Sequence, residues 1–173
     1  MAKKKSKPDL SVDGPEVDAP MRRVFLVVVD ETEEMHAALR YACLRARHTG
    51  GRVALLYVIE PTEFTHWAAV ESLSQEEARE KAESLLQGFS AKVTQWAGEM
   101  PVLHVREGSR RENLLALIEE EPAISILVLG AATGGGGPGP LVSALTGKFV
   151  SKLRIPLTIV PGHLSDEQIA AIA

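Results

Sequence analysis

Short apolar runs that alternate with segments of helical periodicity constrain the fold of this chain more than any other feature. The runs lie at residues 24–29, 53–59, 102–105, 124–129 and 155–160. They are rich in β-branched residues and are mostly uninterrupted by polar ones, which is typical of strands covered on both faces of a parallel sheet. The β-α-β-α-β-α-β-α-β order therefore predicts a three-layer α/β/α fold, Rossmann-like, with a five-stranded parallel sheet.

Capping signals indicate where the helices between the strands begin. Thr32 is suited to cap the first helix, and capping-box patterns at residues 74–77 and 109–112 predict the starts of the second and third. Pro140 fits the first position of a fourth helix, whose apolar stripe is expected to run to Leu153. The third strand is short and contains a polar residue, so we expect it at an edge of the sheet.

The chain of 173 residues has room for one domain and short terminal segments. Residues 1–20 combine lysine, proline, aspartate and glycine with little apolar content, and we expect a disordered N-terminal tail. Residues 21–162 hold all the strands and form the predicted α/β domain. Residues 163–173 are expected to be a C-terminal tail with a helical pattern from Asp166.

Composition argues against several classes of function. The net charge of −4 disfavours general nucleic-acid binding, and no apolar run reaches the ~20 residues of a membrane helix. The five histidines lack the spacing of metal ligands, so no metal site is expected. The single cysteine, Cys43, forms no internal disulfide, and the cytoplasm is the predicted compartment.

A glycine-rich stretch follows the fourth strand and precedes the fourth helix. Seven of the 14 glycines lie between residues 126 and 148. Glycine allows backbone N–H groups to approach a ligand closely, and a helix N-terminus favours an anion such as phosphate. The alternative is a flexible connection whose glycines contact nothing. Asp30 ends the first strand, so if the first and fourth strands are neighbours, Asp30 and Gly130 face one crevice.

Over about residues 22–162, the chain resembles the universal stress protein family. The resemblance depends on Val-Val-Asp30 at the end of the first strand, on Leu-Val-Leu-Gly130, and on the closing segment 147–160 with its helix, basic residue, proline and short strand. It implies a sheet of order 3-2-1-4-5 and a homodimer formed through the fifth strand. For one branch of the family it also implies ATP or AMP binding without a fixed enzymatic task.

The nucleotide-binding branch has the motif G-x2-G-x9-G-[S/T] after the fourth strand, and two alignments of this chain compete. Counted from the second glycine of the stretch, the spacing fits Gly134, Gly137 and Gly147. Counted from Gly130, as in the family, Thr133 takes the place of a glycine and the loop is about four residues too long.

Under both alignments, Lys148 replaces the hydroxyl residue of the motif. A lysine contacts phosphate by charge, or it points to solvent with Lys152. A Walker P-loop is excluded because Phe149 follows Gly147-Lys148 and Val142 stands where the first glycine belongs.

The resemblance also implies roles for individual residues. Asp30 would accept a hydrogen bond from the adenine amino group, and Val58 would offer backbone contacts to the base. The phosphate would be surrounded by N–H groups near Gly130, Gly134, Gly137 and Gly147. The alternatives are that Asp30 is a polar strand terminus and that Val58 is ordinary sheet core.

Two functional hypotheses follow from the sequence. The first is a stress-response or regulatory protein that binds ATP or AMP with no dedicated catalytic activity. The second is a homodimeric interaction protein of the same fold that binds no nucleotide, which Lys148 and the altered loop favour. A nucleotide hydrolase is less favoured because no general base or activated nucleophile is evident.

Overall fold

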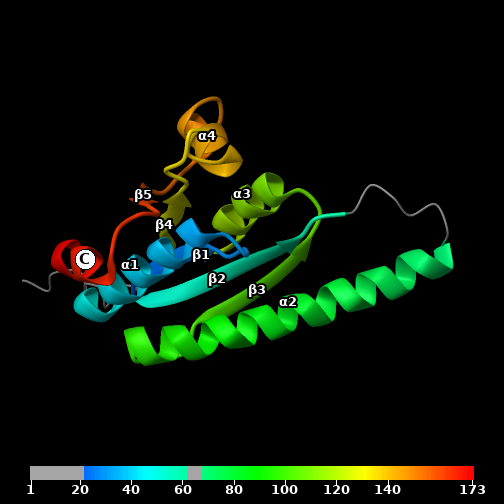
Figure 1. Ribbon diagram of the computed structural model, residues 1–173, viewed down its shortest axis with the longest axis horizontal. Helices are drawn as coiled ribbons and strands as arrows, with labels where there is room; N and C mark the ends of the chain where they lie inside the picture. The colour runs from blue at the N-terminus through cyan, green and yellow to red at the C-terminus, as the bar shows by residue number, and fades with distance from the viewer. Residues whose placement is uncertain (1–21, 62–67) are drawn as a thin grey trace, which may run out of the picture.

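A computed structural model describes residues 22–61 and 68–173 of the chain. The five strands form one parallel sheet in the order β3-β2-β1-β4-β5 (Figure 1), which confirms the predicted fold. They are β1 Val24–Val28, β2 Arg52–Ile59, β3 Val102–Glu107, β4 Ile124–Ala131 and β5 Leu157–Pro161. All five residues of β1 are buried, as its uninterrupted apolar sequence requires at the centre of a sheet covered on both faces.

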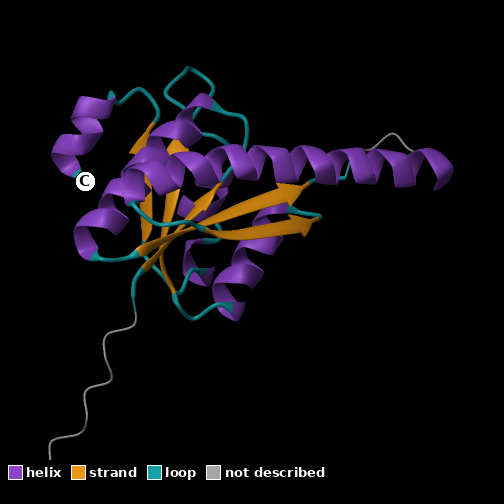
Figure 2. Ribbon diagram, turned by 90° about the horizontal axis from the view of Figure 1, so that it is seen from below, coloured by secondary structure: helices purple, strands orange, loops and turns teal. Residues whose placement is uncertain are grey.

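Helices cover both faces of the sheet (Figure 2). One face packs against α1 Glu33–Thr49, α2 Ala68–Ala97 and α5 Asp166–Ile172, and the other against α3 Arg110–Glu120 and α4 Pro140–Thr146. Successive residues of β1 alternate between the two cores: Phe25 lies in the first and Leu26 in the second. β1 pairs with both β2 and β4, so the strand order reverses between β1 and β4.

The structure corrects the predicted start of the second helix and confirms that of the third, although without the predicted capping bond. The helix α2 begins at Ala68, so the capping-box pattern at residues 74–77 lies inside it. Ser109 is at the N-cap of α3 as expected, but its side chain makes no capping hydrogen bond. The amide of Asn113 instead donates to the carbonyl oxygens of Ser109 and Glu107, which ties the start of α3 to the end of β3.

The fourth helix is shorter than its apolar stripe predicted. It ends at Thr146, and a 3-10 turn, η1 Val150–Lys152, carries the chain toward β5. The hydroxyl of Thr146 donates to the carbonyl oxygen of Val142, and Gly147 then leaves the helical region of backbone conformation. We name residues 132–139, between β4 and α4, the outer loop.

The chain ends on a helix that packs against the core. Ser165 and Gln168 form a capping box at the start of α5, which begins at the expected Asp166. Ile169 is buried with α1 residues, so this segment contributes to the core. β3 lies at one edge of the sheet, as its polar interruption predicted, and β5 lies at the other. Among the described residues, no helix has the length and apolar character needed to cross a membrane.

Candidate functional site

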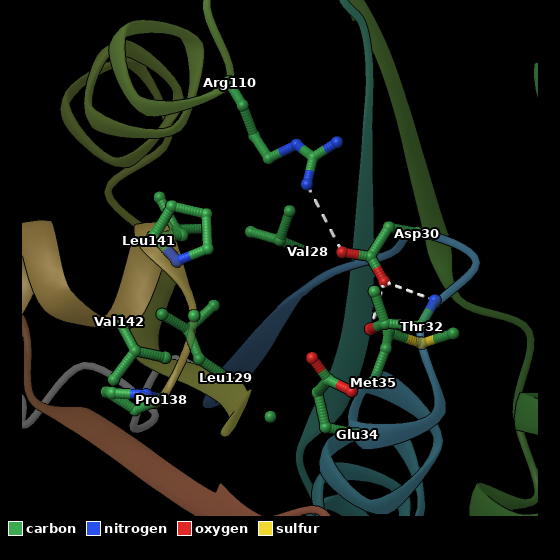
Figure 3. A pocket seen from close by; sticks show the side chains of 13 residues that line it. Val28, Asp30, Thr32, Glu34, Met35, Arg110, Leu129, Pro138, Leu141 and Val142 are labelled. Atoms are coloured by element: carbon green, nitrogen blue, oxygen red, sulfur yellow. Dashed lines mark hydrogen bonds and ion pairs between the residues drawn. The ribbon is translucent and has the colours of Figure 1, made fainter. Parts of the chain in front are cut away.

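A cavity of about 180 Å³ opens at the carboxyl ends of β1 and β4 (Figure 3). Asp30 and Gly130, one hundred residues apart in the chain, both line it. The expectation that these two residues face one crevice is thereby confirmed. In doubly wound sheets, ligands bind at this position, where the strand order reverses.

The carboxylate of Asp30 is held by hydrogen bonds on both oxygens. Its Oδ1 accepts from the backbone N–H of Thr32 at 2.9 Å and from the Thr32 hydroxyl at 2.6 Å. Its Oδ2 accepts from a guanidinium N–H of Arg110 at 3.3 Å (Figure 3). Asp30 therefore shapes the turn from β1 into α1 and presents a fixed, charged acceptor at the cavity wall.

Arg110 is a residue of this site that the sequence analysis did not identify. It is the first residue of α3, three residues after the end of β3, and it also forms an ion pair with Glu60 at 3.0 Å. Both acidic partners follow strands of the same parallel sheet. The sequence did offer one signal, because Arg110 follows a predicted strand. The carboxyl ends of parallel strands meet at one edge of the sheet, and Asp30 lies at the same edge.

Gly130 is required by close packing. A Cβ atom at this position would lie 2.1 Å from the carbonyl oxygen of Glu34 and 2.9 Å from the backbone nitrogen of Met35. The first turn of α1 therefore approaches β4 so closely that no side chain fits between them. Gly162 lies against the same turn, with a Cβ position 2.6 Å from that of Glu34.

The other five predicted site residues do not line the cavity: Val58, Gly134, Gly137, Gly147 and Lys148. Val58 is 4% exposed and belongs to the core between the sheet and α3. Their contacts with a nucleotide stay predictions.

The outer loop is exposed, and its glycines face open space. No atom lies within 4 Å of a Cβ placed on Gly134 or Gly137. Gly147 caps the end of α4, and the ammonium group of Lys148 lies over the ring of Phe149 at 5.8 Å. The Cβ positions of these two loop glycines are therefore unobstructed.

A second hollow, of about 230 Å³, adjoins the cavity. It is lined by Glu60, Ser109, Arg110, Arg111, Pro140, Leu141 and Ala144. Arg110, Pro140 and Leu141 line the cavity as well, so they form the partition between the two spaces.

Cys43 and the side chains able to bind a metal were the other candidates for reactive groups in the sequence. Burial raises the pKa of the Cys43 thiol to about 12, which makes it a poor nucleophile at neutral pH. Over residues 22–61 and 68–173, no group of three or more histidine, cysteine or acidic side chains is placed to hold a metal ion.

The fold and the crevice define a doubly wound α/β protein with a cavity at its switch point. The model of the universal stress protein family matches residues 21–161, and the chain belongs to that family. No curated protein sequence matches the chain.

Three solved structures illustrate the likeness of fold. The universal stress protein UspA from Lactobacillus plantarum is 18% identical, with a TM-score of 0.66, and the match covers 83% of this chain and 99% of that one. A universal stress family protein from Arabidopsis thaliana with AMP bound is 14% identical, with a TM-score of 0.57, over 84% and 94% of the two chains. A universal stress protein in complex with cAMP is 12% identical, with a TM-score of 0.56, over 82% and 98%.

Proposed function

We propose that this protein is a stress-response regulator that binds an adenine nucleotide, ATP or AMP, in the cavity between Asp30 and Gly130. The observation that carries the proposal is the meeting of the Asp30 carboxylate and the end of β4 around one cavity. Two universal stress proteins of the same fold hold AMP and cAMP, which supports an adenine nucleotide as the ligand.

The cavity wall suits a flat base with a polar edge. Val28, Leu129 and Val142 supply apolar surface, and Asp30 supplies a hydrogen-bond acceptor fixed by Thr32. Small-molecule sites typically combine such apolar walls with a few fixed polar groups. The Asp30 carboxylate is matched to the amino group of adenine, which is a donor.

The cavity has room for only part of a nucleotide. Its volume of about 180 Å³ is below the ~300 Å³ at the lower end of ordinary ligand pockets. We assign it to the base, so that the sugar and phosphate extend beyond its rim.

No dedicated catalytic activity is part of the proposal. Hydrolysis needs an activated nucleophile, and Cys43 does not supply one because burial raises the pKa of its thiol. The proposed location is the cytoplasm, on the basis of a single buried cysteine.

Nucleotide recovery tests the proposal. Protein purified without added ligand is denatured, and the released material is identified by ultraviolet absorbance and chromatography. We also expect millimolar AMP or ATP to raise the melting temperature, because a ligand that binds only the folded state stabilises it. An Asp30→Ala variant should lose that shift, and Asp166→Ala, at an exposed position of α5, should keep it. Absence of both released nucleotide and thermal shift in the natural chain would contradict the proposal.

A second candidate function is a homodimeric interaction protein whose site holds no nucleotide. The exposed outer loop and the placement of Lys148 away from the cavity favour it. Along the β5 edge, the exposed side chains of Val150 and Ile159 border an apolar groove of about 480 Å³. We propose that β5 pairs with β5 of a second copy in either case.

Light scattering tests the dimer separately from nucleotide binding. We expect the mass of two chains at micromolar concentration and the mass of one chain for Ile159→Lys, because a charge buried at the interface destabilises association. Glu167→Lys, on the exposed surface of α5, is the matched control. A monomeric natural chain would remove the dimer from both candidate functions.

A further inference from the structure

We propose that the side chain of Arg110 regulates nucleotide binding by competing with the base for Asp30, and that it shifts to Glu60 alone when the base binds. The inference rests on the proposed function, since it concerns regulation of the same site. Arg110 is the first residue of α3, and its guanidinium group extends to the cavity wall (Figure 3). The apparent affinity for a nucleotide then depends on the fraction of molecules in which Arg110 has left Asp30.

Arg110 contacts the oxygen of Asp30 that the base needs. The other oxygen, Oδ1, accepts two hydrogen bonds from Thr32, one from the backbone N–H at 2.9 Å and one from the hydroxyl at 2.6 Å. A carboxylate oxygen has two lone pairs, so Oδ1 has no acceptor capacity left. An amino group must therefore approach Oδ2, which accepts from the guanidinium group of Arg110. The amino group and the guanidinium group are both donors, and they compete for this oxygen.

Arg110 has a second acidic partner outside the cavity. Its Nη2 lies 3.0 Å from a carboxylate oxygen of Glu60, which lines the second hollow and not the cavity. The contact of its Nη1 with Asp30 is longer, at 3.3 Å, which is just beyond the ~3.2 Å limit of typical N–H···O hydrogen bonds. The contact with Asp30 is therefore the one that breaks first, and Arg110 keeps an ion pair when it does.

The exchange of partners leaves no charge without a partner. When a base occupies the cavity, its amino group replaces Arg110 as the donor to Oδ2 of Asp30. Arg110 remains paired with Glu60, whose side chain is 51% exposed against 23% for Asp30, so the guanidinium group moves toward water. Because unpaired charges away from water are costly and none is created here, the two arrangements can lie close in free energy. Such a balance is what a regulated site requires.

Arg110 also limits the room for a ligand. Together with Pro140 and Leu141 it lies between the cavity of about 180 Å³ and the second hollow of about 230 Å³. Each space by itself is below the ~300 Å³ at the lower end of ordinary ligand pockets. Movement of the Arg110 side chain away from Asp30 would join them into one space above that limit. The same movement that frees Oδ2 therefore provides room for the base and its sugar.

Calorimetric titration with adenosine tests the inference, because adenosine carries no phosphate that a positive charge could attract. We expect Arg110→Ala to bind adenosine about fivefold more tightly than the natural chain, since it removes an ion pair that must otherwise be broken. Arg110→Gln should change the affinity in the same direction and provides the readout if Arg110→Ala is not folded. AMP is titrated in parallel.

A double-variant cycle tests the role of Glu60. Glu60→Gln removes the alternative partner, so Arg110 stays with Asp30 and adenosine should bind about twofold to threefold more weakly. In the Arg110→Ala background the same substitution should have no effect. This dependence of one substitution on the other is not expected of a residue with a merely structural role.

Two control variants remove charges of the same sign elsewhere. Arg47→Ala removes a positive charge in the last turn of α1. Glu112→Gln removes a negative charge from the first turn of α3, at a side chain that is 74% exposed and lines neither space. Both should keep the adenosine affinity of the natural chain within about twofold. Circular dichroism and thermal melting establish that each variant is folded.

Three outcomes would overturn the inference, and they are distinguishable. If the natural chain binds AMP but neither Arg110 variant binds adenosine more tightly, the nucleotide site stands and the competition fails. If Glu60→Gln weakens binding equally with Arg110 and with Ala at position 110, Glu60 acts without Arg110 and the exchange of partners fails. If neither adenosine nor AMP binds to any of the proteins, the proposed function fails and the inference fails with it.

Discussion

The end of β4 contains one glycine and the outer loop that follows it contains five, and these glycines have different surroundings. At Gly130, the backbone of α1 occupies the space where a side chain would lie, with the Glu34 carbonyl oxygen 2.1 Å from the Cβ position. At Gly136 in the outer loop, nothing lies within 4 Å. One glycine is required by packing in the folded protein, and the other is not.

This difference shows that the end of β4 is a packed part of the cavity wall and that the outer loop is an exposed connection. Gly130 allows α1 to approach β4, and this approach brings Thr32 and Asp30 to the wall of the cavity. The outer loop has conformational requirements only at its end, where Gly137 and Gly139 have positive φ values of 87° and 96°. Glycine content alone therefore does not mark the residues that shape the cavity.

The largest expected effect is at Gly130. We expect Gly130→Ala to lower the free energy of unfolding by about 3 kcal/mol, because the new methyl group collides with backbone atoms that cannot move independently. Urea denaturation measures the change. Alkylation of buried Cys43 in the same α1 helix should become faster in this variant. An unchanged denaturation midpoint would show that the close approach does not occur.

The next effect is at Asp30. Asp30→Ala removes the acceptor for two Thr32 donors and for Arg110, and we expect a loss of about 1–2 kcal/mol in the free energy of unfolding. Denaturation of Asp30→Ala, Arg110→Ala and the double variant separates the two contributions. Additive losses in the double variant would show that Asp30 and Arg110 are not coupled.

A smaller effect, of opposite sign, is expected in the outer loop. Gly136 has open space at its Cβ position and no positive φ. Gly136→Ala should leave the folded state unstrained and raise stability by about 0.5 kcal/mol, since alanine restricts the unfolded chain. Thermal melting checks this, and a clear loss of stability would place the loop in a packed environment.

The smallest expected effect is a change of stability with pH. Residues 131–147 contain no titratable side chain, so this effect is expected elsewhere, at His104. Burial lowers the pKa of His104 on β3 from its usual 6.5, and Arg106 lowers it further, against the opposing effect of Glu121 and Glu120. Between the lowered pKa and 6.5, the unfolded chain binds more protons, so stability falls as the pH falls through this window.

His104→Gln should flatten this part of the stability profile. Denaturation at several pH values between 5 and 8 measures it, with His163→Gln on the exposed C-terminal segment as the control. An equal slope in the natural chain and in His104→Gln would show that another group is responsible.

The sheet could be predicted from the sequence because its signal is local. Uninterrupted apolar runs such as 24–29 indicate strands buried on both faces, and the resemblance supplied the strand order. Boundaries were less predictable: the pattern at 74–77 resembles a helix start, but α2 begins at Ala68. A capping-box pattern marks the start of a helix only when the residues before it are not already helical.

The residues of the candidate site that lie at strand ends could be predicted from the sequence. The residue whose side chain extends to the cavity from another element could not. Asp30 and Gly130 follow from two adjacent strands that end at one edge. Arg110 comes from a third segment, and its pairing with Asp30 requires the relative placement of α3 and β1. The motif predicted a ligand contact for Lys148, but its side chain does not line the cavity and its ammonium group lies over the ring of Phe149.

Amide chemical shifts recorded during titration with AMP test the central claim most directly. We expect the largest changes at Asp30, Thr32, Gly130 and Arg110, and small changes at Gly134 to Gly137. Large changes confined to the outer loop, with none at Asp30 or Arg110, would contradict the account.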